Sequence, residues 1–250
     1  MAGHSKWAQI KRQKAVNDKA RGRLFSKLAR EISVAAREAG KEPDFNPRLR
    51  TAIANAKAEN MPNDNIERAI LRGSGELPGV SYQSLTYEGY GPGGAALFIE
   101  CLTDNSKRTV AEIRHILEKD GGNLGRDGSV AWMFERRGQV YIDSARYGED
   151  AVLDAALEGG AQDVARDDDL FVVSTASEDF HAVQDALRRR GIDIQEAELA
   201  MLPTSTRHVE GREAERLLQL VSRLQDQDDV QRIFYNFEVD EQAWEALSAS

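Results

Sequence analysis

Lys and Arg side chains crowd the start of the sequence, where they could neutralise the phosphates of a nucleic acid. Residues 3–31 read GHSKWAQIKRQKAVNDKARGRLFSKLARE. Basic groups in such a run displace condensed counterions from DNA or RNA, and the indole of Trp7 could stack on an exposed base. The residues predicted to bind nucleic acid are Lys6, Trp7, Lys11, Arg12, Lys14, Lys19, Arg21, Arg23 and Lys27.

The charge of this region contrasts with that of the remaining sequence. Residues 1–75 contain 16 Lys or Arg and 8 Asp or Glu, a net charge of +8. The other residues contain 17 and 34, a net charge of −17, which gives the chain of 250 residues its total of −9. Such asymmetry is typical of a polyanion-binding part joined to an acidic part. It favours binding over the competing interpretation, a solvated basic face with Trp7 in a core.

Patterns typical of other chemistry are missing from the sequence. None of the four histidines lies at metal-ligand spacing with Cys or with another His. The run GYGPGG at residues 89–94 precedes strand-like residues, so it predicts a hairpin turn rather than a phosphate loop. The acidic run at residues 167–169 predicts a solvated hairpin tip. With no nucleophile motif in view, we predict a protein that is not an enzyme and that has no metal and no cofactor.

The apolar runs and the cysteine count limit the cellular environments in which we expect the protein. The longest apolar runs, such as AALFI at residues 95–99, are far shorter than the roughly 20 residues of a membrane span. The single cysteine, Cys101, excludes a disulfide framework within the chain and fits a reducing cytosol. We therefore expect a cytoplasmic protein with no membrane partner. Its oligomeric state does not follow from these patterns, and our expectation is a monomer or weak oligomer.

Three predicted helices follow the polar, basic segment that ends at about Ala20, and they position that segment. Apolar residues recur at helical spacing from Leu24 onward. A second helix lies in DFNPRLRTAIANAKAEN, with Asn46 as its cap and Pro47 at its first position. A third lies in MPNDNIERAILRG and is capped by Asn63 or Asp64. These helices predict a small N-terminal helical domain.

Strands and helices alternate after a Gly, Pro and Ser linker at residues 74–82. The run GSVAWMFERR, residues 128–137, predicts a strand, and residues 139–202 follow with the order βαββαβ, in which Ser177 caps the second helix. The predicted fold is α+β, a helical domain plus two α+β (ferredoxin-like) domains, one inserted in the other. The predicted domains are residues 1–77, residues 78–137 together with 207–250, and the inserted residues 138–206.

Motifs along essentially the whole chain resemble the YebC family. They include MAGHSKWAQIKRQKAVNDKARGRLFSKLAREI, NPRLRTAIANAKAENMPNDNIERAI, YEGYGPGGAALFIECLTDN and RTVAEIRHILEKDGGNLGRDGSVAWMF. Members are often labelled probable transcriptional regulatory proteins, and mitochondrial relatives are known as translational activators of cytochrome oxidase. Where the family usually has TDNRNRT this chain has TDNSKRT, which retains Lys107 and Arg108 as a secondary polyanion contact. Where SVAYLF is common it has Trp132 and Met133.

Three functional hypotheses follow from the charge pattern and the resemblance. The first is a non-enzymatic, DNA-binding transcriptional regulator whose partners are DNA and the transcription machinery. The second is a factor that binds ribosomal RNA on the ribosome, as a translational activator or an elongation-assisting factor. The third is a module whose helical head contacts an acidic partner protein. No helix-turn-helix or RNP aromatic motif distinguishes DNA from RNA, and binding to phosphates and shape suits both.

Overall fold

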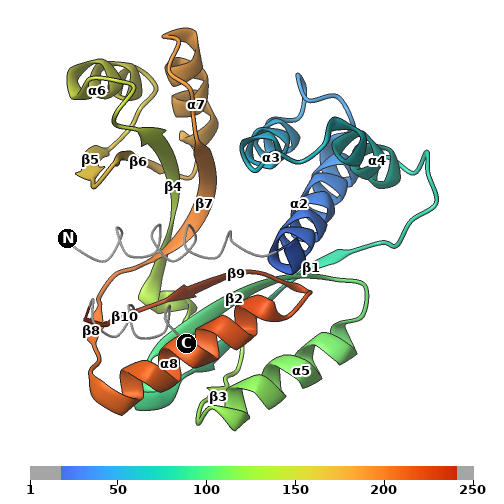
Figure 1. Cartoon of the computed structure of the whole chain (residues 1–250), viewed down its shortest axis with the longest axis vertical. Helices are drawn as coiled ribbons and strands as arrows, with labels where there is room; N and C mark the ends of the chain where they lie inside the picture. The colour runs from blue at the N-terminus through green and yellow to red at the C-terminus, as the bar shows by residue number, and fades with distance from the viewer. Residues whose placement is uncertain (1–17, 241–250) are drawn as a thin grey trace. The chain divides into compact units, whose positions relative to one another are not determined.

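The structure, a computed structural model, describes residues 18–240, and for residues 18–20 it describes the backbone alone (Figure 1). Within this range the chain forms seven α-helices and two four-stranded sheets, which confirms the predicted α+β fold. No helix in residues 18–240 is long and apolar enough to cross a membrane. The chain divides into two compact units. The described part of unit 1 comprises residues 18–27, 80–135 and 201–240, and unit 2 comprises residues 28–79 and 136–200.

Unit 1 is built on a sheet with the strand order β3-β1-β2-β9. Its elements are β1 (Gln83–Tyr90), η1 (Pro92–Gly94), β2 (Ala96–Thr103), α5 (Ser106–Lys119), β3 (Asn123–Leu124), η2 (Ala131–Met133), β8 (Arg207–His208), α8 (Gly211–Asp226), β9 (Val230–Tyr235) and β10 (Phe237–Glu238). Strands β3 and β2 flank β1, which is antiparallel to both, so β2, α5 and β3 form a split βαβ unit. The short strands β8 and β10 pair in parallel as a separate ribbon.

The core of unit 1 lies between the sheet and the helices α5 and α8. Leu97 and Ile99 of β2 are fully buried in it, together with Ile113 of α5. Three α8 residues that helical spacing marks as inward-facing, Leu217, Val221 and Leu224, belong to the same cluster. The amphipathic pattern of α8 is therefore explained by burial of one helix face against the sheet.

The run GYGPGG contains the end of β1 and the hairpin turn between β1 and β2, as predicted. Gly93 and Gly94 have φ values of 67° and 74°, which favour glycine. A Cβ atom placed on Gly91 would lie 2.5 Å from Cδ2 of Leu217, so this glycine lets the turn approach α8 closely. The glycines therefore serve conformation and packing.

Unit 2 contains the predicted βαββαβ order, in a sheet with the strand order β5-β6-β4-β7. Its elements are β4 (Phe134–Asp143), α6 (Glu149–Glu158), β5 (Asp163–Asp167), β6 (Leu170–Ala176), α7 (Phe180–Arg189) and β7 (Glu196–Pro203). Strand β6 lies between β4 and β5 and is antiparallel to both, which is the arrangement of a ferredoxin-like fold. Side chains of α6 and α7 pack with those of β4 and β6 in one apolar core.

Unit 2 also holds the helices α3 (Pro47–Ala58) and α4 (Asn63–Gly73) and the second half of α2 (Asp18–Ala39). Asn46 caps α3, because its side chain accepts a hydrogen bond from the Leu49 amide at 3.0 Å. The same buried side chain donates to the carbonyl oxygens of Ala35 and Gly40, at 2.8 and 2.7 Å. A single predicted cap therefore also fixes the end of α2 against the start of α3.

Three local predictions were wrong. Residues 128–133 are not a strand, because the amides of Gly128, Val130 and Ala131 bind a side chain and cannot pair with a neighbouring strand. Strand β4 begins at Phe134 and runs on through the residues predicted as the next strand. Ser177 does not cap α7, since its hydroxyl donates to the carbonyl oxygen of Arg136 and the helix begins after Asp179. Pro62, rather than Asn63 or Asp64, occupies the cap position of α4.

Candidate nucleic-acid interface

The positive charge of the N-terminal region is concentrated in its first part. Residues 1–27 hold eight Lys or Arg and one acidic residue, Asp18, a net charge of +7. Residues 28–75 hold eight Lys or Arg and seven Asp or Glu, a net charge of +1. Residues 28–75, which hold the second half of α2 and the helices α3 and α4, are thus nearly neutral. The basic character belongs to residues 1–27.

Most of the predicted binding residues precede the described part of the chain. Lys6, Trp7, Lys11, Arg12 and Lys14 lie outside residues 18–240, and the side chain of Lys19 is also outside the description. Arg21, on the first half of α2, is exposed. The role of this set in binding nucleic acid stays a prediction.

Arg23 and Lys27 contact the C-terminal end of α8, which lies in the same unit. The Arg23 guanidinium lies 3.4 Å from the Asp226 carboxylate. The Lys27 ammonium donates to the carbonyl oxygen of Gln225 at 2.8 Å. The last carbonyls of a helix carry partial negative charge, so cations are stabilised there. A nucleic acid that bound these two residues would compete with the end of α8.

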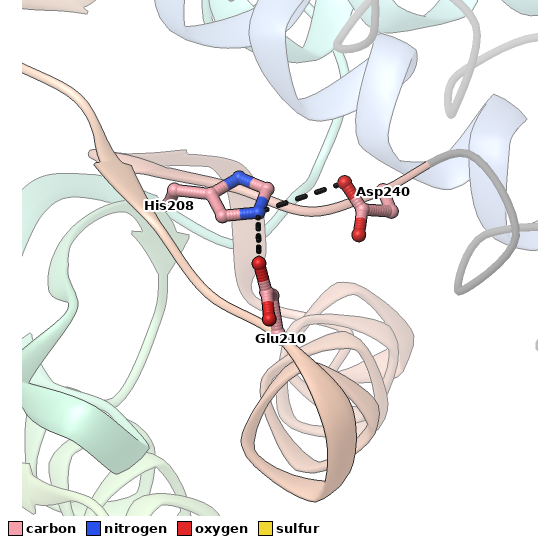
Figure 2. Close-up of side chains that lie close together, drawn as sticks. All are labelled: His208, Glu210 and Asp240. Carbon is pink, nitrogen blue, oxygen red and sulfur yellow. Dashed lines mark hydrogen bonds and ion pairs between the residues drawn. The ribbon is translucent and has the colours of Figure 1, made fainter.

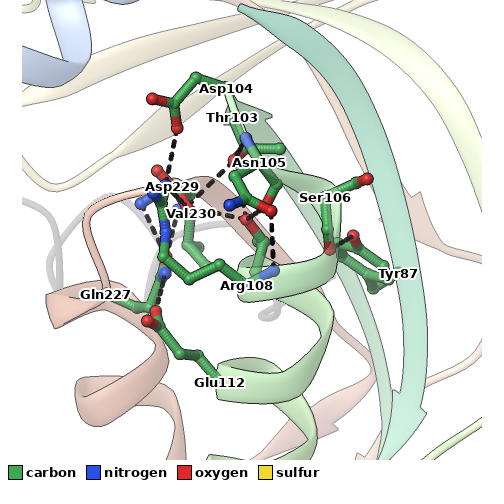
Figure 3. Close-up of polar contacts among 11 residues, drawn as sticks. Tyr87, Thr103, Asp104, Asn105, Ser106, Arg108, Glu112, Gln227, Asp229 and Val230 are labelled. Carbon is green, nitrogen blue, oxygen red and sulfur yellow. Dashed lines mark hydrogen bonds and ion pairs between the residues drawn. The ribbon is translucent and has the colours of Figure 1, made fainter.

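Arg108, a predicted secondary contact, lies between two carboxylates of unit 1 (Figure 3). One guanidinium nitrogen, Nη2, lies 2.8 Å from Asp104 Oδ1 and 2.8 Å from Asp229 Oδ2. The hydrogen bonds that Arg108 donates to Asp229 and Asp104 raise its pKa. Its neighbour Lys107 is exposed at the start of α5. The two cations of the TDNSKRT motif are therefore not equivalent, since a phosphate at Arg108 would compete with two carboxylates.

Asp229 is the centre of this polar cluster, and sequence analysis missed it. Its side chain is 2% exposed, and Oδ2 accepts hydrogen bonds from Thr103 Oγ1 at 3.1 Å and Thr109 Oγ1 at 2.8 Å as well as from Arg108. Burial alone would raise the pKa of Asp229, but these hydrogen bonds outweigh it and lower the pKa. The cluster joins the end of β2 and the start of α5 to the turn before β9.

Glu88 organises the loop that was predicted to be a strand. Its buried carboxylate accepts hydrogen bonds from the amides of Gly128, Val130 and Ala131, at 2.6, 2.6 and 2.8 Å. Burial by itself would raise the pKa of Glu88, whereas the three amides lower it and prevail. The loop leads into η2, where Trp132 is 71% exposed. The family-typical aromatic position therefore presents its ring to solvent instead of packing it in a strand.

His208, Glu210 and Asp240 form a small exposed group that sequence spacing did not predict (Figure 2). Nε2 of His208 lies 3.0 Å from Glu210 Oε1 and 3.6 Å from Asp240 Oδ1. Pairing of β8 with β10 brings the two chain segments together. The contacts are those of an exposed polar group, and we assign no metal to it.

Cys101 is the one thiol of the chain, and it lies buried in the core of unit 1. Burial, with the Asp229 charge as a further cause, raises the pKa of Cys101 to about 12. A thiol with this pKa is protonated at neutral pH and is a poor nucleophile. The residue therefore acts as a small apolar side chain.

Comparison with known proteins covers both parts of the chain. The family described as the TACO1/YebC protein N-terminal domain matches residues 5–76, and the TACO1/YebC second and third domain matches residues 82–237. A protein from Halothermothrix orenii named "Probable transcriptional regulatory protein" is 51% identical over 251 residues, covering 99% of each chain. One from Persephonella marina with the same name is 49% identical over 99% of this chain and 100% of its own. The crystal structure of a conserved hypothetical protein from Aquifex aeolicus has 44% identity and a TM-score of 0.82, covering 90% of this chain and 93% of that one.

Proposed function

Because the chain belongs to the TACO1/YebC family, we propose that it is a non-enzymatic regulator of gene expression that binds DNA through its basic N-terminal segment. The observation that carries this proposal is the net charge of +7 in residues 1–27 of a chain whose total is −9. The shared name of its relatives, probable transcriptional regulatory protein, supports a regulatory role.

The binding mechanism is electrostatic. Each Lys or Arg that neutralises a backbone phosphate releases a condensed counterion, and the gain in counterion entropy drives association. The acidic remainder of the chain is repelled by the same phosphates. The protein therefore approaches a nucleic acid with residues 1–27 leading, and the charge asymmetry orients it.

The exposed start of α4 argues for contacts to phosphates over reading of base edges by this helix. A recognition helix places its N-terminal residues against bases in the major groove. The exposed residues at the start of α4 include Asp64 and Glu67, whose carboxylates would face a strongly negative groove. Sequence-specific reading by α4 is therefore disfavoured.

This property of α4 favours a second candidate function, binding of ribosomal RNA by a factor that acts on the ribosome in translation. RNA helices are recognised mostly through shape, phosphates and 2′-hydroxyls, because side chains do not read their narrow major groove. A basic segment without a recognition helix suits such a target. Under this second candidate function, residues 1–27 contact ribosomal RNA instead of DNA.

The proposal is tested by a triple charge reversal, Lys11→Glu, Arg12→Glu and Lys14→Glu. If about five basic residues contact phosphates of duplex DNA, the logarithm of the binding constant falls against the logarithm of salt concentration with a slope of about −4.5. Titration of a labelled duplex by fluorescence anisotropy across a salt series measures this slope. The triple variant is expected to lose binding while its thermal unfolding midpoint stays nearly unchanged.

A matched control reverses three exposed cations of the nearly neutral region, Lys57→Glu, Arg68→Glu and Arg72→Glu. This control changes the total charge equally and is expected to retain most of the affinity. Equal losses in both variants, or a flat salt response of the wild-type protein, would contradict the proposal. Crosslinking in cells with sequencing of bound DNA and bound RNA separates the two candidates, since promoter fragments indicate transcription and ribosomal RNA indicates translation.

A further inference from the structure

Two arginines of unit 2 share one carboxylate. Arg50 of α3 places Nη2 3.3 and 3.2 Å from the two carboxylate oxygens of Asp185 on α7. Arg188, one turn along α7, places Nη1 3.4 Å from Oδ1 of the same aspartate. Well-formed bonds between charged N–H groups and carboxylates are shorter, at about 2.7–2.9 Å. We call Arg50, His181, Asp185 and Arg188 the Arg50–Arg188 cluster.

The guanidinium of Arg188 is positioned by a buried amide. Gln184 is fully buried, and its Oε1 accepts hydrogen bonds from Arg188 Nη2 at 3.1 Å and from Thr51 Oγ1 at 3.2 Å. The amide nitrogen of Gln184 donates to the Phe180 carbonyl oxygen at 3.3 Å. Because the guanidinium is already oriented, less side-chain entropy is lost when a ligand binds it.

The charges in the cluster do not balance. Two guanidinium groups face one carboxylate, which leaves a local excess of positive charge. His181 lies on the same face of α7 as Asp185 and Arg188, at helical spacing. Burial lowers the pKa of His181, Arg50 and Arg188 lower it further, and Asp185 opposes them. The charges nearest His181 are therefore positive on balance. This contrasts with residues 136–200 as a whole, which contain 15 Asp or Glu and only 7 Lys or Arg.

Two other arginines of unit 2, Arg146 and Arg190, each have a carboxylate of their own. Arg146 pairs with Asp193 at 2.6 Å, and Arg190 pairs with Glu158 at 2.8 Å. Each of these pairs is neutral, and its nitrogen–oxygen distance is short. The side chains of Arg50 and Arg188 remain 30% and 33% exposed, which makes them accessible and partly desolvated. Arg50 and Arg188 therefore differ from Arg146 and Arg190, because two guanidinium groups share a single carboxylate.

We propose that the Arg50–Arg188 cluster is a second phosphate-binding site, which takes a backbone phosphate of the nucleic acid through the two guanidinium groups. This inference rests on the proposed function and adds a contact from the otherwise acidic domain. Arginine suits the role because its planar fork matches the oxygens of a phosphate. Gln184 and Thr51 act by positioning the site and not by contacting the ligand.

The test compares Arg188→Gln with Arg146→Gln, which removes the same charge from a neutral pair in the same domain. Binding of labelled duplex DNA and of labelled ribosomal RNA fragments is measured across a salt series. Arg188→Gln is expected to weaken binding about tenfold and to lower the steepness of the salt slope by about 0.9 on duplex DNA. Arg146→Gln is expected to match wild type. Arg50→Gln provides a second variant, and thermal unfolding of each protein shows that it is folded.

The outcomes separate this inference from the proposed function. If Arg188→Gln and Arg50→Gln bind like Arg146→Gln while the triple reversal of Lys11, Arg12 and Lys14 loses binding, the inference alone is overturned. If the triple reversal binds normally and Arg188→Gln does not, the cluster is supported and the N-terminal proposal fails. Absence of any binding by the wild-type protein overturns both. If labelled polyglutamate binds and Arg188→Gln weakens only that complex, the cluster recognises an acidic protein and the inference is wrong.

Discussion

Two arginine clusters, one in each unit, use the same side chains in opposite proportions. In unit 1, Arg108 lies between the carboxylates of Asp104 and Asp229, two anions for one cation. In unit 2, Asp185 lies between Arg50 and Arg188, two cations for one anion. The carboxylate of Asp229 is almost fully buried, whereas the side chain of Asp185 is 44% exposed. The ratio of cations to anions and the burial of the carboxylate therefore distinguish a structural cluster from a candidate binding site. The residue types alone do not.

The largest effect is expected when the central aspartate of each cluster is replaced and the free energy of unfolding is measured. Asp229→Ala leaves Arg108, Thr103 and Thr109 without their shared acceptor, and the two threonines are fully buried. Removing one partner of a buried network costs about 3 kcal/mol of unfolding free energy. Asp185→Ala, at a partly exposed pair, is expected to change that free energy by less than about 1 kcal/mol. Urea unfolding of both variants measures the difference.

The pH dependence of the Asp229→Ala difference identifies its electrostatic origin. The folded-state pKa of Asp229 is lowered, so its contribution is fully present above the unfolded value of about 3.9 and is lost as pH falls through the folded value. The stability gap between wild type and variant should therefore narrow in strong acid. If the difference in unfolding free energy stayed constant in acid, the loss would come from packing and not from charge. The contrast between the Asp229 and Asp185 clusters would then be weaker.

A smaller effect is expected from Arg108→Gln, which tests the secondary contact predicted from the sequence. Asp229 keeps its two threonine donors in this variant, so the loss of stability should be smaller than in Asp229→Ala. The salt slope for nucleic-acid binding should stay as in wild type, because Arg108 is already paired with two carboxylates. A slope that became less steep by about 0.9 would show a phosphate contact at Arg108 and remove the distinction between the clusters.

The smallest expected effect is a gain of affinity. Asp185→Asn removes the one carboxylate that partly neutralises Arg50 and Arg188, while keeping the shape of the side chain. Binding of labelled duplex DNA is expected to tighten about threefold, since an opposing charge close to the phosphate is lost. Asp193→Asn, at the Arg146 pair, serves as the control and should leave the affinity unchanged. Weaker binding in Asp185→Asn would mean that the carboxylate is needed to hold the two guanidinium groups in place.

Much of the fold could be predicted from the sequence, because its signals act over a few residues. Asn46 and Pro47 mark the start of α3 within one turn of the helix, and the structure places both as predicted. The order βαββαβ and the inward residues of α8 follow from apolar spacing along each element. Local signals failed where a distant group intervened, as at residues 128–133, whose amides are taken by the carboxylate of Glu88.

The sequence by itself determined the charge asymmetry, the Asn46 cap of α3, most of the periodic elements and the family of this protein. Only the tertiary structure decided which charges are paired, because the partners are far apart along the chain. Asp229 follows Arg108 by 121 residues, and Asp185 follows Arg50 by 135. No local spacing reports such a pair. Its existence depends on how the helices and strands pack, so burial and partner count, which separate structural from available arginines, emerge only after folding.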